Sequence, residues 1–398
     1  MSFTASEDWR NAGFGLYVHW PFCQAKCPYC DFNSHVAREV DQKRWLAAYE
    51  SEIRRLSQDA PGRVLNTVFF GGGTPSLMAP ETVAGVLEAA RSAWPFANDI
   101  EITLEANPTS VEADRFRAYR EAGVNRLSMG IQSLNDEHLR RLGRLHTVSE
   151  ARKAFTIARD TFDKVSFDLI YARQDQGLPE WQAELGEALS MAIDHLSLYQ
   201  LTIEDGTAFG ARHAAGGLRG LPDDDLSADL YAATQDTCAS AGLPGYEISN
   251  HAAEEAKSQH NLIYWRYGDY AGVGPGAHGR LSNQAGRFAT DTPLQPGAWL
   301  EKVERHGNGE ASRTPLPAEE QAAEYLMMSL RLTEGMDSLR YEKLMGKPLD
   351  EAAILSLEDL GLLERRDDRL RATVQGRMVL NGICLLYTSP SPRDRQKS

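Results

Sequence analysis

Three of the five cysteines in this chain of 398 residues lie within a stretch of eight residues, at Cys23, Cys27 and Cys30. Their spacing, C-x3-C-x2-C, places three thiols on one short segment. Thiolates are the ligands that proteins use for structural zinc and for iron–sulfur clusters. The pattern therefore predicts a metal centre on this segment. The number of cysteines, three rather than four, helps to decide which metal or cluster it is.

A structural zinc site has a closed shell of four ligands, and His19, Asp31 or His35 could supply the fourth here. A cubane [4Fe–4S] cluster takes one thiolate per iron, so three cysteines leave one iron open to another molecule. Cys238 is remote and has helical neighbours, so we expect it in the core. The sequence favours the cluster with an open iron. Zinc and an incidental grouping of buried thiols remain the alternatives.

Six short segments rich in β-branched and aromatic residues occur in the first half of the chain and must position this centre. They begin near residues 16, 67, 101, 126, 164 and 195, and helical stretches at 41–56, 80–94 and 110–123 lie between them. Alternating strands and helices predict parallel βα units. Six units are too few to close an eight-unit barrel. We therefore expect an α/β fold, a partial (βα)6 TIM-like barrel, over residues 1–204.

Polar residues and glycines sit where these strands end. They are Cys23, the GGGTP segment at 71–75, Glu105 with Asn107, Gln132, Asp168 and Glu204. The carboxyl ends of parallel strands share one face of a barrel, so all of these residues are expected around one cavity.

The rest of the chain divides into three parts. Residues 205–315 are expected to extend the barrel, and 260–280 reads as a cavity-lining loop because it combines aromatic residues with glycines. Residues 316–384 predict a small α+β, winged-helix-like domain with a packing role, since no basic stripe for DNA is visible. Residues 385–398 do not continue the preceding helical pattern and are expected to be a non-native tail.

Composition excludes several classes of protein. The formal net charge is −14, which disfavours general nucleic-acid binding. The sequence contains no run of about 18 apolar residues, so no membrane-spanning helix is expected. The polar, acidic N-terminus lacks the features of a secretory signal, and five cysteines do not suit a disulfide framework. A cytoplasmic location is expected.

The C-x3-C-x2-C motif after the first strand of a partial βα barrel resembles the radical S-adenosylmethionine superfamily. The resemblance implies a [4Fe–4S] cluster held by Cys23, Cys27 and Cys30, with S-adenosylmethionine chelating the open iron. In that superfamily the reduced cluster cleaves the sulfonium to methionine and a 5′-deoxyadenosyl radical. The cofactor supplies the difficult chemistry, and the protein binds, orients and shields it.

The segment YVHWPFC, from Tyr17 to Cys23, resembles the oxygen-independent coproporphyrinogen III oxidase branch of that superfamily, with similarity from about residue 14 to 384. The resemblance implies an S-adenosylmethionine site that comprises Tyr17, Gly72, Gly73, Thr74 and Glu105. It also implies that Gln132, Arg144 and Asp168 line the same cavity, where the oxidase binds a second S-adenosylmethionine.

Two features separate the chain from the oxidase. Phe32 stands where the oxidase carries a fourth cysteine, and HNLIYW at 260–265 matches an H-N-x-x-Y-W motif of oxidase relatives that are proposed to be haem chaperones. The resemblance implies haem bound near His260, Asn261, Tyr264 and Trp265, and transfer to an acceptor such as a haem-dependent respiratory protein.

Histidine is a common axial ligand of haem iron, and aromatic side chains suit a macrocycle. The residues alone favour His260 as a loop histidine bonded to backbone, and the resemblance is what favours it as a ligand; His278 is another candidate ligand, with a turn role as the alternative. Three functions stay open: the haem chaperone, the oxidase that decarboxylates coproporphyrinogen III, and a zinc-stabilised barrel that binds an unrelated small molecule. Whether the chain is an enzyme is left undecided.

Overall fold

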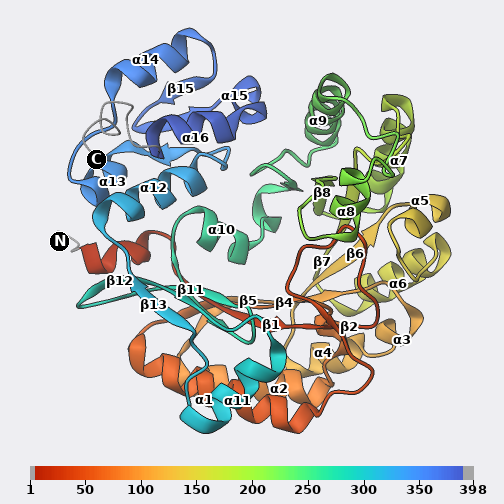
Figure 1. Ribbon diagram of the computed structural model, residues 1–398, viewed down its shortest axis with the longest axis vertical. Coiled ribbons are helices and arrows are strands. Elements are labelled where there is room, and N and C mark those ends of the chain that lie inside the picture. Colours follow the sequence, from red (N-terminus) through yellow and green to blue (C-terminus); the bar gives the residue numbers. More distant parts are fainter. Residues whose placement is uncertain (1–4, 389–398) are drawn as a thin grey trace.

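The computed structural model describes residues 5–388. Within that part of the chain the main sheet has eleven strands in the order β13-β12-β11-β10-β1-β4-β5-β6-β7-β8-β9. Its central six strands are parallel and are β1 (Phe14–Trp20), β4 (Leu65–Gly72), β5 (Phe96–Ala106), β6 (Arg126–Gln132), β7 (Lys164–Tyr171) and β8 (His195–Gln200). The sheet curves without closing, and helices cover its outer side (Figure 1). The predicted partial (βα)6 barrel is confirmed.

The helices between these strands begin and end at local signals. They are α1 (Gln42–Asp59), α2 (Pro80–Ala93), α3 (Ser110–Ala113), α4 (Phe116–Ala122), α5 (Asp136–Arg141), α6 (Val148–Thr161) and α7 (Leu178–Met191). Thr147 and Glu150 form a capping box at the start of α6. Gly123, with φ of 115°, ends α4 in the left-handed region. The prediction of a single helix at 110–123 is wrong in one respect, because the structure has two helices there, α3 and α4.

The main core lies between the sheet and these helices. Trp20 on β1 packs edge-on against Trp45 on α1, with ring centroids 5.9 Å apart. Trp45 also stacks on Trp299 of α11 (Pro296–His306) at 5.4 Å. All three rings are almost wholly buried. The outer face of β1 is therefore fixed against two helices far apart in the sequence, and its inner face is left for the site.

The expectation of a loop at 260–280 is wrong. This segment contains α10 (Gln259–Trp265), β10 (Asp269–Val273) and the start of β11 (His278–Asn283). β10 pairs in parallel with β1, and Gly272 lies opposite Tyr17. A Cβ on Gly272 would lie 2.0 Å from the carbonyl oxygen of His278, so this glycine permits close backbone packing within a sheet.

Antiparallel strands complete both edges of the sheet. Beyond β10 and β11 lie β12 (Gly286–Asp291) and β13 (Ser312–Pro315), and at the other edge β9 (Asn250–Ala252) pairs with β8. The connection from β8 to β9 contains α8 (Ala208–Ala214) and α9 (Asp224–Ser240). None of the described helices has the length and apolar character needed to cross a membrane.

The C-terminal part forms a small α+β unit with its own hydrophobic core. Its elements are α12 (Ala318–Ser329), β14 (Met336–Asp337), α13 (Ser338–Met345), α14 (Glu351–Asp359), β15 (Leu363–Arg366), β16 (Arg369–Ala372), α15 (Val374–Met378) and α16 (Leu380–Thr388). The strands β15 and β16 form a hairpin that turns at Asp367, whose φ is 55°. Figure 1 shows this unit at one end of the sheet, beyond α10.

The helix α16 runs to Thr388, so the helical pattern continues past residue 384, and the expectation of a non-native tail at 385–398 stays a prediction. Residues 389–398 lie outside the described residues. The proposed boundaries at 204 and 315 stay predictions.

A buried ion network fixes β10 and β11 to the rest of the sheet. The Asp269 carboxylate accepts from Arg63 Nη1 at 2.7 Å and from the Ser282 hydroxyl at 3.0 Å, and it also accepts from the Ser282 backbone N–H. Arg287 Nη2 lies 3.3 Å from the same carboxylate. Both arginines and the aspartate are almost wholly buried.

Replacing Asp269 with Asn should destabilise the protein by about 3–5 kcal/mol, because two buried guanidinium groups would lose the charge that compensates them. The measurement is chemical denaturation of the anaerobically purified protein, read as the unfolding midpoint and slope. The control is Glu304→Gln, which breaks the exposed Arg44–Glu304 pair and should cost much less. Equal midpoints for the two variants would contradict the assigned role of Asp269.

Candidate functional site

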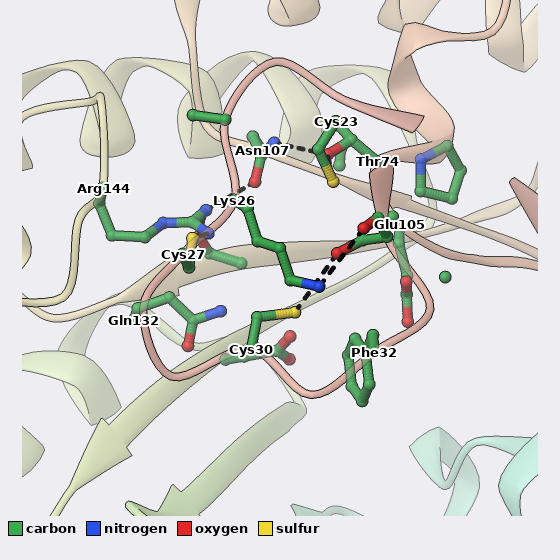
Figure 2. A pocket seen from close by; sticks show the side chains of 18 of the residues that line it. Cys23, Lys26, Cys27, Cys30, Phe32, Thr74, Glu105, Asn107, Gln132 and Arg144 are labelled. Atoms are coloured by element: carbon green, nitrogen blue, oxygen red, sulfur yellow. Dashed lines mark hydrogen bonds between the residues drawn. The ribbon is translucent and has the colours of Figure 1, made fainter. Parts of the chain in front are cut away.

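The strand ends converge on one cavity of about 150 Å³. Ten of the residues singled out from the sequence line it: Cys23, Cys27, Cys30, Gly72, Gly73, Thr74, Glu105, Gln132, Arg144 and Asp168. Figure 2 shows the cysteine-bearing loop arching across this cavity, with side chains from β5 and β6 beneath it. One strand-end expectation is wrong: Glu204 is exposed to solvent and is not among the residues that line the cavity.

The three thiols lie on the loop between β2 (Phe22–Cys23) and β3 (His35–Val36) and are free and partly exposed. Burial raises the pKa of the Cys23 and Cys30 thiols. Each sulfur also has a polar neighbour. Thr74 Oγ1 donates to Cys23 at 3.3 Å, Arg144 Nη1 donates to Cys27 at 3.5 Å, and the Ser34 hydroxyl lies 3.9 Å from Cys30.

Asn107 connects two of these neighbours across the cavity. Its Nδ2 donates to Thr74 Oγ1 at 3.3 Å, and its Oδ1 accepts from Arg144 Nη2 at 2.6 Å (Figure 2). Arg144 Nη2 also donates to the carbonyl oxygen of Gly130 at 2.8 Å. The hydrogen bonds to Cys23 and Cys27 therefore belong to one connected network, which fixes the two sulfurs relative to the ends of β4, β5 and β6.

The glycines at the end of β4 are required by packing. Gly72 has φ of 110°, and a Cβ there would lie 2.6 Å from the His19 ring. A Cβ on Gly73 would lie 2.8 Å from the Phe22 carbonyl oxygen. The backbone N–H groups of Gly73 and Thr74 donate to the carbonyl oxygens of Trp20 and Phe22. The glycines thus bring the end of β4 directly against the start of the cysteine loop.

Gln132 shows the features of a ligand-binding residue. Its backbone has φ of 74°, which is unusual for a residue with a side chain, and strain of this kind is concentrated at functional sites. Its Oε1 is buried and has no hydrogen-bond partner among the described residues. A buried acceptor without a partner costs free energy, and a bound molecule would supply the missing donor.

Two carboxyl groups inside the cavity have raised pKa values. Burial, and next the charge of Asp168, raise the pKa of Glu105 to about 8. Burial raises the pKa of Asp168 to about 6, against the opposing effect of hydrogen bonds from Ser197 and Ser128. Glu105 therefore carries a proton at neutral pH and can donate a hydrogen bond. Asp168 is the carboxylate available to accept one or to balance a cation.

These residues fit an iron–sulfur cluster with a small polar ligand. Within the described residues no three His, Cys, Asp or Glu side chains converge on a single ion. A cubane cluster does not require that convergence, because each thiolate binds a different iron. Beside the thiols the cavity offers a protonated carboxyl, a carboxylate and an unpaired amide oxygen, and these can hold an amino acid and a nucleoside.

Five residues expected at the site do not line the cavity. Tyr17 lies just below it, where its hydroxyl is 2.9 Å from His19 Nδ1 and its ring stacks on Phe69 with centroids 6.3 Å apart. The other four, His260, Asn261, Tyr264 and Trp265, lie on α10, which packs against the inner face of β1 and β4.

His260 is 1% exposed, and both of its ring nitrogens are occupied. Nδ1 lies 2.6 Å from Thr67 Oγ1, and Nε2 lies 2.8 Å from the Tyr264 hydroxyl. Burial lowers the pKa of His260 to about 3, so the ring is neutral. Its suggested role as a haem ligand stays a prediction, and it would require one of these hydrogen bonds to break.

Sequence reasoning assigned no role to several residues that line the cavity, namely Lys26, Tyr29, Asn107 and Ser128. Asn107 was noted at a strand end, but its link between two cysteines depends on the positions of three strands. Ser128 could have been found from the register, because it lies directly opposite Glu105 on the neighbouring strand. Lys26 and Tyr29 lie between the cysteines in the sequence, and this position could have identified them as residues of the cavity.

Comparison with known proteins identifies the class. Residues 17–176 match the radical SAM superfamily, and residues 316–379 match the HemN C-terminal domain. The solved structure of coproporphyrinogen III oxidase (HemN) from Escherichia coli, described as a radical SAM enzyme, superposes with a TM-score of 0.80 over 97% of this chain and 92% of its own, at 22% identity. The chain has the HemN-like radical SAM fold.

Relatives that align over nearly the whole chain identify the family. Heme chaperone HemW of Escherichia coli (strain K12) is 37% identical over 94% of this chain and 97% of its own length. Radical S-adenosyl methionine domain-containing protein 1, mitochondrial, of Bos taurus is 39% identical over 94% of this chain and 87% of its own. The chain belongs to the HemW family of radical SAM proteins. The superfamily implies a [4Fe–4S] cluster and S-adenosylmethionine.

The raised pKa of Glu105 predicts a pH dependence of stability. Below its ordinary pKa of roughly 4.3 the carboxyl is protonated in both the folded and the unfolded chain. Between about pH 5 and pH 8 the unfolded chain releases this proton and the folded chain keeps it, so the free energy of unfolding should fall as pH rises. Glu105→Gln should remove up to about 1 kcal/mol of this decline per pH unit.

The measurement is denaturant unfolding of both proteins over that pH range, before S-adenosylmethionine is added. Asp168→Asn is the matched control and should change the slope mainly at the acid end, between about pH 4 and pH 6. The same slope in Glu105→Gln as in the parent chain would mean that Glu105 ionises normally in the cavity.

Proposed function

We propose that this chain is a haem chaperone, which binds haem and transfers it to an acceptor protein while carrying a [4Fe–4S] cluster with exchangeable S-adenosylmethionine. The similarity to proteins named heme chaperone HemW over 94% of the chain carries the proposal. Phe32 supports it, because it stands where the oxidase branch has a fourth cysteine. The acceptor is proposed to be a haem-dependent respiratory protein.

Cys23, Cys27 and Cys30 would hold the cluster. When bound and reduced, such a cluster supplies the electron that cleaves S-adenosylmethionine. Thr74 and Arg144 would stabilise the thiolates, since hydrogen bonds to the sulfurs tune the potential of iron–sulfur clusters. The end of β4 would let the ligand approach its backbone closely, because Gly72 and Gly73 have no side chains.

The remaining residues of the cavity would orient the ligand. The protonated Glu105 would donate to a ribose or amino-acid oxygen, and the Gln132 amide oxygen would accept from the ligand. Asp168 and Arg144 provide opposite charges on the far side, suited to an amino group and a carboxylate. Tyr17 would act from below through His19, since its hydroxyl bonds the ring that packs against Gly72.

The second candidate is coproporphyrinogen III oxidation. It is favoured by the HemN-like fold and by the presence in the cavity of Gln132, Arg144 and Asp168, which match oxidase positions. Phe32 weighs against it. In this chain Phe32 is 60% exposed and lines the same cavity as the three cysteines, so an apolar ring stands where the oxidase branch carries a thiol.

The HNLIYW motif at 260–265 is proposed to belong to the haem-handling part of the chain. Asn261, Tyr264 and Trp265 are partly exposed, and Arg331 lies over the Trp265 ring at 6.0 Å. A cytoplasmic location is part of the proposal. It is supported by the acidic composition and by a cluster that needs reduced thiols, and cell fractionation tests it.

The proposed function predicts haem uptake without porphyrinogen oxidation. Anaerobically reconstituted protein mixed with haemin should develop a Soret band at about one haem per chain, and it should pass this haem to an apo-haem protein. Iron, sulfide and haem are quantified on one sample. With coproporphyrinogen III, dithionite and S-adenosylmethionine no protoporphyrinogen should form. Its formation would establish the second candidate, and failure to take up haem would refute the chaperone.

Replacing Cys27 with Ser should abolish the visible absorption of the cluster, because one iron loses its thiolate. Haem binding should persist, since the thiols belong to a different site. The measurements are iron and sulfide content and the Soret band. Cys238→Ala is the control, because this buried thiol lies in the core and the variant should keep a full cluster. A full cluster in the Cys27 variant would contradict the assignment.

A further inference from the structure

His260 lies deep inside the barrel, away from any surface that could receive a flat macrocycle. Its ring sits above Gly15, where a Cβ would be 3.3 Å from His260 Cε1, and beside Thr67. Gly15 and Thr67 are paired across β1 and β4. Gly71, which adjoins the cavity, is four residues further along β4, or about 13 Å. His260 therefore belongs to the floor of the barrel, opposite the cysteines.

The hydrogen bonds and ring contacts of His260 connect the residues that form this floor. Its backbone N–H donates to Glu101 Oε1 at 3.1 Å, and its ring stacks on Phe69 with centroids 4.9 Å apart. Phe69 stacks in turn on Tyr17. An imidazole with both nitrogens bonded and one face covered supports the residues beneath the cavity. It has no free lone pair for iron.

The other histidines leave few candidates for an iron ligand. The chain has ten histidines. Those buried are His19, His138, His146, His195, His251 and His260; those exposed are His213, His278 and His306; and His35 is intermediate. His213 and His306 lie at the C-terminal ends of α8 and α11, on the periphery. His278 is the exposed histidine that the sheet brings to the cysteine loop.

The strand register places His278 next to that loop. Pairing of Tyr270 with Arg280 sets His278 opposite Gly272, and Gly272 pairs with Tyr17 on β1. The segment just before β11 packs directly on the loop and the strand that leads to it: a Cβ on Gly274 would lie 2.3 Å from the His19 carbonyl oxygen, and one on Gly276 would lie 2.5 Å from Asn33 Nδ2. The His278 ring has no hydrogen-bond partner within residues 5–388, so a nitrogen is available.

An apolar rim adjoins His278 beside the cysteine cavity, which one of its members, Phe32, also lines. Asn33 Nδ2 donates to the carbonyl oxygens of Pro275 and Leu294, both at 2.9 Å, and so joins the loop to the segments that flank β11 and β12. Around this link Phe32, Val36 and Leu294 are 60%, 59% and 62% exposed. Large apolar side chains gathered at one place on a surface mark a binding site.

Two charged residues complete the requirements of a haem site. Arg38 is exposed two residues after Val36 and offers a cation for a propionate. Asp291 is the cross-strand partner of His278, and such partners have neighbouring side chains. A carboxylate beside the imidazole is the partner that metal-bound histidines commonly use to fix the ring.

We propose that haem binds on this rim, formed by Phe32, Val36 and Leu294, with His278 as the axial ligand of its iron. The proposal rests on the proposed haem function and assigns the ligand within it. The macrocycle would lie against these apolar side chains beside the cysteine cavity, which Phe32 also lines. His260 then acts as a positioning residue of the barrel floor.

The test is a haemin titration of the anaerobically purified, cluster-containing full chain, followed by Soret absorption and electron paramagnetic resonance of the ferric haem. His278→Ala should weaken haemin binding about tenfold or more and move the Soret maximum toward that of free haemin. His306→Ala, which removes another exposed histidine, should change neither. In His278→Gly, added imidazole should restore the Soret band of the parent chain.

A folded His260→Ala variant should keep the Soret band and lose thermal stability, because a buried ring and two hydrogen bonds are removed. The proposal fails if His278→Ala binds haemin with unchanged affinity and spectrum. It also fails if the folded His260 variant, checked by circular dichroism, loses the band that His278→Ala retains. In both cases haem uptake by the parent chain leaves the chaperone function standing. If the parent chain binds no haemin, both proposals fall.

Discussion

The close contact between the end of β4 and the start of the cysteine loop holds the site together. Gly72 faces the His19 ring at a distance that excludes a Cβ, and Gly73 faces the Phe22 carbonyl. His19 is itself fixed, because the Tyr49 hydroxyl donates to its carbonyl oxygen at 2.7 Å and its Nε2 lies 2.9 Å from the Asn33 carbonyl. One buried histidine thus connects α1, the glycine turn and the far end of the loop.

The inner face of the sheet is built in layers above α10. His260 with Gly15 and Thr67 forms the lowest layer, and the stacked rings of Tyr17 and Phe69 form the next. Above them lie Gly71 and the cavity. Since strand residues two apart point to the same face, each layer follows from alternate positions of β1 and β4. The aromatic layers therefore lie beneath the cavity and separate it from α10.

Much of this arrangement could be predicted from the sequence, because its signals are local. The six strands read as apolar runs with polar residues at their ends, and the parallel topology alone then gathers Cys23, Glu105 and Asp168 at one edge. The C-terminal helices and hairpin were equally visible from periodicity and turn residues. These features depend on residues that are neighbours in the chain and on the rule that parallel strands end at the same edge of a sheet.

The errors share a different physical origin. The segment at 260–280 looked like a loop because its glycines and aromatic residues suit one, yet β10 forms by pairing with β1, which is more than 250 residues away. Such a glycine signals close backbone approach as readily as a turn, and the two cannot be told apart without the partner strand. His260 was singled out by its motif, but its burial depends on Gly15 and Thr67, which no local pattern connects to it.

The cysteine loop has two faces with different chemistry, and this limits how the sites can act together. Its thiols line the cavity, Phe32 lines the same cavity and is also 60% exposed, and Val36 and Leu294 are exposed beyond it. Asn33 holds both faces, since its carbonyl oxygen bonds the His19 ring and its amide bonds the segments around β11. A change at the thiols can therefore reach the outer rim through backbone that is bonded on both sides, whereas α10 is separated from the thiols by the aromatic layers. Coupling between a cluster and a haem on this chain would accordingly depend on residues 31–36 rather than on the HNLIYW helix.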